Sequence, residues 1–562
     1  MNNLRRFQSL CMFTACGLFL SSAMAQSARP FVPGSVAPGR LHDEIVPINV
    51  VPQPIEIRYA QFPTVAVYGQ VAQPFVLRNV RISGNLASCG SFFYEELIGK
   101  SVNQHDITRL ADCIAQYYRE HGYPFTLVEV PQQSFAGGEL ELVIHEPFVS
   151  QVDFCNCSPC IQRALECYAT KLKNLKPGCC GSLGASIDRV LMLANQMAGV
   201  QLKAEIMPDP AHVGGLKVCI TSYFKQFGLD LAYDNYNVDW QGPHEYNGSV
   251  YANSLLFIGD RAVADVVTST DVNELQYYGF QYDLPVGMSG TRIHAWFNYA
   301  ENKPEFSLAG YDFRGDAYVG GLLVKYPFIL SLPASLYGYI GARFTESDLT
   351  TLGREYGHEN IRVAFLGASL DQCVWGGQSH GYLELSEGLH LLGGSQPVPF
   401  GDENFTKVEG ELNYQHYIVN NFTFYLAGHG QYGFKPLSVS EQMGIGGRIW
   451  GRAYDWAEIL GDSGIVGTLE LRYDTKPCTL YCNNAQYFLG YDAGVTWLHN
   501  ELNDNDRNQL SSVQGGVRLV FTQYFTGEFV LAKPLTRQVE SQVLSGQDGN
   551  NTRAFFRIAA HL

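Results

Sequence analysis

Charged residues are scarce in this 562-residue chain, and most of those present are acidic. Only 16% of the residues are charged, whereas ordinary soluble domains have about 25%. Lys plus Arg total 38 and Asp plus Glu total 54, which gives a net charge of −16. The shortage of basic residues argues against a nucleic-acid-binding protein, because such a protein needs a basic face to neutralise phosphates.

Long apolar runs are also missing after residue 25. No later stretch has the roughly 18 consecutive apolar residues of a transmembrane helix. The mean hydropathy is −0.07, and the chain is rich in Gly (57), Tyr (33) and Phe (33). If the mature chain spans a membrane, it must do so as a closed β-barrel, the other structure that satisfies backbone polar groups in lipid.

Enzyme motifs are absent from the sequence. There is no Gly-x-Ser-x-Gly elbow, no His-Glu-x-x-His pair and no P-loop. The glycines Gly444, Gly446 and Gly447 precede a loop and do not lie in a βαβ unit, so they do not indicate a dinucleotide site. We therefore predict no catalytic residues, no cofactor and no resident metal.

Residues 1–25 form a predicted signal peptide. Arg5 and Arg6 are followed by a short apolar core, Leu10–Leu20, and by the Ala-x-Ala site Ala23-Met24-Ala25. The alternative is a membrane anchor, but about a dozen apolar residues are too few to span a bilayer. We expect the mature chain to begin at Gln26 and to be exported.

Three further regions precede the C-terminal half. Residues 26–72 are rich in proline, which breaks long helices, and we interpret them as an N-terminal segment or linker. Residues 73–147 predict the order β-α-α-β-β, with Ile107, Leu110 and Ile114 on one helix face. Residues 148–225 repeat this order and contain most of the cysteines. We therefore predict two consecutive α+β units of one topology.

Residues 226–562 alternate strictly between apolar and polar positions. In 465–473 one face carries Ile465, Leu469 and Leu471, and the other carries Glu470 and Arg472. A soluble β-sandwich also alternates, but the signal peptide and the long strands favour a membrane barrel. Counting turn signals gives about 16 strands, an even number that suits one antiparallel transmembrane β-barrel.

Two such units followed by a barrel resemble the two-partner secretion transporters of the hemolysin activation/secretion family. Their α+β units are POTRA domains. The resemblance spans about residues 33–562 and is most specific at Leu437–Gly447, which is similar to the lead-in of the family's long inward loop, here about residues 433–463. The segment Gly451-Arg452-Ala453-Tyr454-Asp455 then resembles the family motif Val-Arg-Gly-Tyr/Phe, with Gly and Ala at positions where Val and Gly are usual.

The resemblance implies that Arg452, at the loop tip, meets an acid on the barrel wall. Gly490-Tyr491-Asp492-Ala493-Gly494 keeps the Asp and Gly of the family motif Phe-x-Asp-x-Gly, and Phe488 lies two residues earlier on the same face. We therefore expect Arg452 and Asp492 to latch the loop inside the lumen. The alternative is that both are ordinary solvated charges of the pore and its turns. The presence of an N-terminal plug helix stays open.

The implied function is an outer-membrane translocator. We expect its POTRA domains to lie in the periplasm, to bind an unfolded hemolysin- or adhesin-type exoprotein at exposed sheet edges, and to pass it through a monomeric barrel pore in contact with lipid. The alternative for the POTRA units is that they act only as spacers. Alternatives for the whole chain are an outer-membrane barrel assembly factor (insertase) or, less favoured, a small-solute porin, which would lack the repeated units.

Twelve cysteines follow the signal peptide. Because the periplasm is oxidising, we expect disulfides and not a zinc site in the Cys155-x-Cys157-x-x-Cys160 cluster. Their connectivity stays open. The cysteines expected in disulfides are Cys89, Cys113, Cys155, Cys157, Cys160, Cys167, Cys179, Cys180, Cys219, Cys478 and Cys482.

Overall fold

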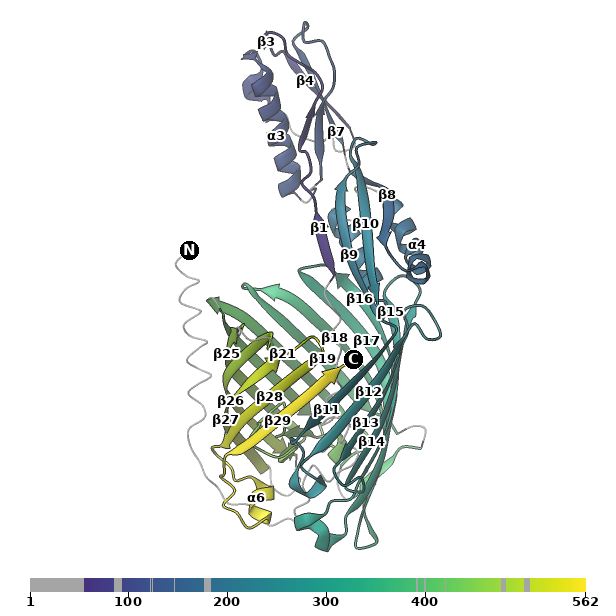
Figure 1. Cartoon of the computed structure of the whole chain (residues 1–562), viewed down its shortest axis with the longest axis vertical. Helices are drawn as coiled ribbons and strands as arrows, with labels where there is room; N and C mark the ends of the chain where they lie inside the picture. The colour runs from purple at the N-terminus through teal and green to yellow at the C-terminus, as the bar shows by residue number, and fades with distance from the viewer. Residues whose placement is uncertain are drawn as a thin grey trace. The chain divides into compact units, whose positions relative to one another are not determined.

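A computed structural model describes residues 55–84, 93–121, 123, 125–145, 147–175, 183–390, 393–398, 401–419, 421–476, 482–499 and 506–562 (Figure 1). The predicted signal peptide and the first part of the proline-rich segment lie outside these residues. Among the described residues, no helix is long and apolar enough to cross a membrane.

The first α+β unit is a four-stranded sheet covered by one long helix. Helix α3 (Gln104–Glu120) begins with a capping box, in which Asn103 Oδ1 accepts the N–H groups of His105 and Asp106, and Asp106 Oδ2 accepts that of Asn103. Its predicted apolar face is buried. The sheet order is β2-β6-β7-β4. The elements of this unit are β2 (Val65–Val67), β3 (Phe75–Val76), β4 (Asn79–Gly84), η4 (Glu95–Leu97), β5 (Ser101–Val102), α3, β6 (Leu127–Val130) and β7 (Glu139–His145).

The second α+β unit follows the predicted order closely. Its sheet order is β1-β9-β10-β8, and its two helices pack their apolar faces on one side, with Ile161, Leu165 and Ile187 fully buried. The elements are β1 (Glu56–Tyr59), β8 (Phe148–Asn156), α4 (Pro159–Lys173), α5 (Leu183–Asn195), β9 (Val200–Pro208) and β10 (Gly215–Phe224).

The segment predicted as a linker is partly structured. Residues 55–69, here called the strap, supply β1 to the second sheet and β2 to the first, each as a parallel edge strand beside β9 and β6. Ile57 packs on the second core and Val65 on the first. The predicted start of the first unit at residue 73 is therefore too late, because both sheets recruit a strand from the preceding segment.

The C-terminal part is a closed antiparallel barrel of sixteen main strands, in which β29 closes on β11 (Figure 1). A short strand, β20 (Ser395–Val398), pairs beside β18. The main strands are β11 (Phe227–Asp234), β12 (Glu245–Asn253), β13 (Arg261–Ser269), β14 (Leu275–Val286), β15 (Thr291–Asn302), β16 (Arg314–Leu330), β17 (Ala334–Thr351), β18 (Arg354–Val374), β19 (Gly377–Gly388), β21 (Thr406–Val419), β22 (Phe422–Gly433), β25 (Ser463–Thr475), β26 (Asn484–Leu498), β27 (Asp506–Val520), β28 (Phe525–Pro534) and β29 (Arg553–His561).

The two faces of each strand differ as alternation predicts. On β26, Tyr487, Leu489 and Tyr491 are exposed on the outer face, with Leu489 at 69%, whereas Phe488 and Asp492 on the inner face are buried. The outer band is apolar and aromatic, which suits lipid, and the inner face carries the charges. Among the described residues, short helical elements occupy three connections besides the one between β22 and β25: η5 (Asp239–Gln241), η6 (Phe306–Tyr311) and α6 (Glu540–Leu544).

Candidate functional site

The loop between β22 and β25 folds back against the inner wall of the barrel. It contains η7 (Val439–Glu441) and a small hairpin of β23 (Met443–Ile445) and β24 (Ile459–Gly461), in which Ile445 pairs with Ile459. The hairpin packs on β25, β26 and β27 and shares a buried apolar cluster with Val466, Phe488 and Leu510. This is the predicted inward loop.

Gly494 on β26 makes room for the hairpin. A Cβ at this position would lie 2.8 Å from Ile445 Cδ1 and 2.9 Å from Val466 Cγ2. The glycine predicted from the wall motif therefore lies at a close approach of the loop to the barrel, and a side chain there would crowd β23.

The loop tip turns sharply on glycines. Gly451 has φ +77°, a left-handed conformation that favours glycine, and a Cβ there would meet Leu510 Cδ1 at 2.9 Å. This explains why the tip has glycine at the position where the resembling motif carries valine. The turn directs the N–H groups of Gly451 and Arg452 at the wall.

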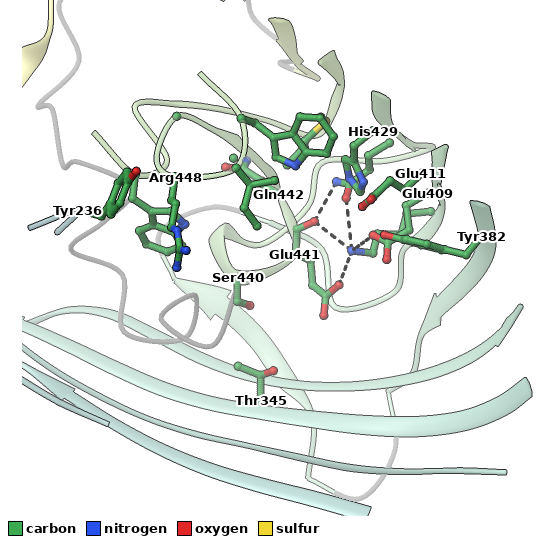
Figure 2. Close-up of a pocket in the computed structure, with 18 of the residues that line it drawn as sticks. Tyr236, Thr345, Tyr382, Glu409, Glu411, His429, Ser440, Glu441, Gln442 and Arg448 are labelled. Carbon is green, nitrogen blue, oxygen red and sulfur yellow. Dashed lines mark hydrogen bonds and ion pairs between the residues drawn. The ribbon is translucent and has the colours of Figure 1, made fainter. Parts of the chain in front are cut away.

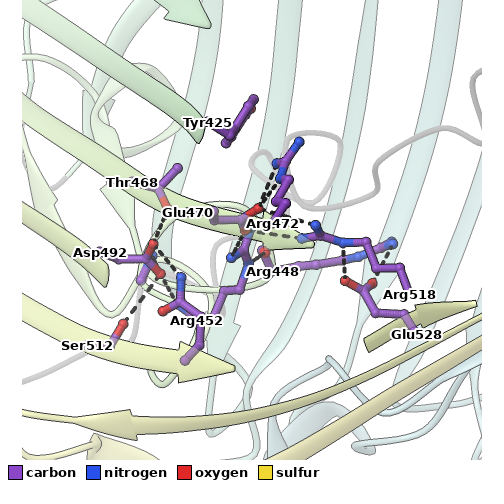
Figure 3. Close-up of polar contacts among 12 residues, drawn as sticks. Tyr425, Arg448, Arg452, Thr468, Glu470, Arg472, Asp492, Ser512, Arg518 and Glu528 are labelled. Carbon is purple, nitrogen blue, oxygen red and sulfur yellow. Dashed lines mark hydrogen bonds and ion pairs between the residues drawn. The ribbon is translucent and has the colours of Figure 1, made fainter. Parts of the chain in front are cut away.

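Asp492 receives the loop tip through backbone groups. Its Oδ2 accepts the N–H of Arg452 at 3.0 Å and that of Gly451 at 3.2 Å, and its Oδ1 accepts the Thr468 hydroxyl at 2.5 Å and Gln514 Nε2 at 2.9 Å (Figure 3). The structure therefore brings Arg452 and Asp492 together as predicted, but through the main chain.

The guanidinium of Arg452 pairs with a different acid, Glu470 on β25. Arg452 Nη1 lies 2.5 Å from Glu470 Oε1, and Arg452 Nε donates to the Arg448 carbonyl at 3.1 Å. The expected guanidinium–Asp492 pair is thus corrected to Arg452–Glu470. Because the backbone N–H groups and polar neighbours already occupy the Asp492 carboxylate, the longer side chain reaches the adjacent strand.

Glu470 is the centre of a wall cluster that sequence reasoning missed. Its side chain is 0% exposed and also pairs with Arg472 at 2.6 Å and Arg518 at 3.1 Å (Figure 3). The Phe488 ring lies under Arg518, 4.0 Å from its guanidinium carbon, and 5.8 Å from that of Arg452. The available signal was the position of Glu470 on the lumen face, two residues beyond Thr468.

The remaining predicted loop residues reach the last strands. Ala453 is fully buried. The Tyr454 hydroxyl lies 3.0 Å from the Ser511 carbonyl and 3.1 Å from the Arg537 carbonyl, either of which can accept its proton. Asp455 pairs with Arg553 on β29 at 2.8 Å and accepts the Ser541 N–H of α6. The segment 451–455 therefore contacts β26, β27, β29 and the connection that contains α6.

The cysteines give one described disulfide, Cys155–Cys219, which joins β8 to β10 with 6.0 Å between the Cα atoms. For Cys113, Cys157, Cys160, Cys167 and Cys482 the structure differs from the prediction, because their thiols are free. Cys160 and Cys167 lie seven residues apart on α4, a rise of roughly 10 Å, which is too far for a bridge. Cys89, Cys179, Cys180 and Cys478 lie outside the described residues, and the described part of the chain contains no group of three or more metal-ligating side chains.

Two α+β units, a sixteen-stranded barrel and a loop latched inside the lumen define a class of outer-membrane transporters with POTRA domains. The family profile described as "Haemolysin secretion/activation protein ShlB/FhaC/HecB" matches residues 221–519, and the profile "POTRA domain, ShlB-type" matches residues 91–147. The chain belongs to this family of two-partner secretion transporters.

Named relatives agree with this assignment. The outer membrane transporter CdiB of Dickeya dadantii is 21% identical over 431 residues, 74% of each chain, and the heme/hemopexin transporter protein HuxB of Haemophilus influenzae strain Rd is 20% identical over 459 residues, 79% of this chain and 80% of HuxB. Among solved structures, CdiB from Escherichia coli has a TM-score of 0.69 at 15% identity, covering 88% of this chain and 92% of its own. CdiB from Acinetobacter baumannii has a TM-score of 0.58 at 15% identity, covering 100% and 97%. These structures share the fold.

Proposed function

We propose that this protein secretes a large exoprotein partner of the hemolysin or adhesin type through its barrel, with its POTRA domains in the periplasm. The client arrives unfolded, binds the POTRA domains as an extended chain and passes through the lumen when the loop moves aside. The protein acts as a monomer in the outer membrane and catalyses no reaction. The observation that supports this proposal is the combination of POTRA sheets that have edge strands with a loop bound to the inner wall of the barrel.

The strap narrows the choice of client-binding edges. An extended client can add a strand to a sheet edge by main-chain hydrogen bonds, which demand little of its sequence. The strap occupies one edge of each sheet, beside β9 and β6. Among the described residues, β8 and β4 form the other sheet ends. We therefore assign client binding to the outer edges of β8 and β4.

Strand β8 is the better of the two edges for an experiment. It has nine residues, against six in β4, and it is tied to the sheet interior by the Cys155–Cys219 disulfide. Gln151 in its middle is exposed. Because the disulfide holds β8 in the sheet, its outer edge offers an incoming chain a fixed row of backbone hydrogen-bonding groups.

Two experiments test this function. The first deletes the gene and identifies proteins in the culture supernatant and surface fraction by mass spectrometry, with the wild-type gene restored as the control. We expect the loss of one or a few large proteins. A broad loss of outer-membrane barrels would instead indicate an assembly factor, and a fall in solute uptake alone would indicate a porin.

The second experiment places a photo-crosslinking amino acid at Gln151 on the β8 edge or, as the matched control, at Glu166 on the exposed face of α4. With the client identified by the first experiment, Gln151 should crosslink to it during secretion and Glu166 should not. Equal crosslinking at both sites would exclude the β8 edge as the binding strand without affecting the secretion result.

A further inference from the structure

The root of the luminal loop makes a second set of buried ionic contacts, separate from those at its tip. Glu441, the last residue of η7, points its carboxylate at β17 and β21 and is only 4% exposed. Its Oε2 lies 2.8 Å from Arg343 Nη2 on β17 and 2.8 Å from Lys407 Nζ on β21. These strands form a different arc of the wall from β25–β27, which hold the tip.

Backbone contacts fix the same turn. The Glu441 carbonyl accepts Gln431 Nε2 at 2.9 Å, and the Ser440 N–H donates to Glu359 Oε1 on β18 at 3.4 Å. Figure 2 shows Glu441 beside Ser440 and Glu409 at the edge of a luminal cavity of about 360 Å³. That cavity is lined on one side by the wall strands and on the other by the loop, so the loop lies inside the lumen.

The wall cations are paired even without the loop. Arg343 Nη1 contacts Glu384 Oε1 on β19 at 3.0 Å, and Lys407 Nζ contacts Glu409 on its own strand at 3.1 Å. Breaking a buried ion pair is expensive mainly because it leaves an unpaired buried charge. Here each cation keeps its own carboxylate, so Glu441 can leave without stranding a charge on the wall.

The tip contact has the same property with the charges reversed. At the tip the loop supplies the cation, Arg452, and the wall acid Glu470 keeps Arg472 and Arg518 when Arg452 leaves. At the root the loop supplies the anion and the wall supplies the cations. Both ends of the loop therefore rest on wall clusters that remain paired after release.

We propose that Glu441 is a second, releasable clamp that holds the root of the luminal loop across the pore, so that the pore opens only when both the Glu441 and Arg452 contacts are broken. The biological role of this clamp rests on the proposed translocation function. The contacts themselves belong to the resting pore, so the clamp can be tested without a client.

The test measures single-channel conductance of the purified full-length protein in planar lipid bilayers. Glu441→Lys places a cation against Arg343 and Lys407, and Glu441→Gln removes the charge while preserving the side-chain size. Because hydrogen bonds to charged groups are strong, we expect E441Q to raise the open probability by about tenfold, and E441K by more. Release of the root alone should leave the tip contacts in place, so neither variant should match the double variant E441Q/R452Q.

The matched control is Glu384→Gln, which removes a partner of Arg343 but contacts the wall only. It should not raise the open probability above that of the wild type, because without Glu384 the Arg343 charge depends on Glu441 and the loop root is held at least as firmly. Folding of every variant is checked by the mobility difference between heated and unheated samples on gels. Wild-type conductance of a folded E441Q would overturn the proposal, as would loss of folding in both Glu441 variants, since Glu441 would then be a folding residue. If the deletion strain secreted normally, the translocation function would fail while the conductance result would still stand.

Discussion

Two segments of this protein return to pack on structure formed elsewhere in the chain, and they are held in different ways. The luminal loop is fixed by charged side chains that are almost fully buried, such as Glu470 at 0% and Glu441 at 4% exposure. The strap is fixed by short parallel strands and by partners open to water: Lys203, which pairs with Glu56 at 3.0 Å, is 60% exposed.

The difference indicates which segment opens first. Local opening is easiest where few buried contacts must be broken, and exposed ion pairs contribute about 0–1 kcal/mol. The strap has only four and three residues in its two strands. We therefore expect the strap to open in thermal fluctuations, whereas the loop needs the bound client or a mutation to release it.

The largest expected effect comes from breaking the tip contact with Arg452→Ala. Loss of a hydrogen-bonded charge should weaken the closed loop by about 1.5–3 kcal/mol. It should not reach the full penalty of a broken buried pair, because Glu470 keeps two arginines. We expect higher resting conductance and strongly reduced secretion of the client from a barrel that still folds.

The matched control is Arg472→Ala. It also removes a partner of Glu470, at 2.6 Å, but Arg472 belongs to the wall strand β25 and stacks over Tyr425. If R472A opened the pore as much as R452A, the effect would come from the charge of Glu470 and not from the anchoring of the loop.

A smaller effect is expected from Gly494→Ala. The added methyl group would lie within 3 Å of Ile445 Cδ1 and Val466 Cγ2, and overpacking of this kind costs about 1–3 kcal/mol. The end of Ile445 can rotate, so secretion should fall only partly and the open probability should rise modestly. Gly430→Ala on β22 is the control, since its nearest neighbour is 3.7 Å away; equal loss in both variants would assign the effect to the strands.

Much of the fold could be predicted because barrel strands are long enough to show a period of two. The helices of the second α+β unit could be predicted equally well, because each carries a full apolar face. The strap was missed because strands of three or four residues among prolines show no period. Such strands depend on the edges of sheets whose other strands come later in the sequence.

The sequence predicted which loop and wall motifs meet in the site, but it did not predict which acid pairs with the Arg452 guanidinium. Alternation placed Asp492 and Glu470 on the lumen face, and the resemblance led from Arg452 to Asp492. Which acid meets the guanidinium depends on strand register, which sets Thr468 opposite Asp492 and Glu470 opposite Gly490, and on backbone N–H groups that no sequence pattern displays. Glu441 was missed for the same reason, because its partners come from distant strands.

The smallest expected effect is the dependence of strap stability on pH, which the luminal loop should not share. The Tyr59 hydroxyl of β1 hydrogen-bonds to Asp188 on α5, and burial raises the pKa of Asp188 above its ordinary 3.8. A carboxyl group with a raised pKa binds its proton more tightly in the folded state, so its contribution to stability is largest at low pH and is lost as the pH rises through that pKa. Glu56 has the opposite sign, because Lys203 and Arg58 lower its pKa from 4.5.

The two contributions are separated by variants, because that of Asp188 is lost as the pH rises through its raised pKa, whereas that of Glu56 is lost as the pH falls through its lowered pKa. With Glu56 replaced by Gln, hydrogen exchange of the strap amides in the full-length protein should therefore show easier opening as the pH rises through the pKa of Asp188, after correction for intrinsic exchange rates. In Asp188→Asn the slope should vanish, whereas Glu56→Gln should keep it, and the loop amides should show none of it. An unchanged slope in D188N would mean that the strap is not held through Asp188, and the contrast between a labile strap and a clamped loop would then rest on burial alone.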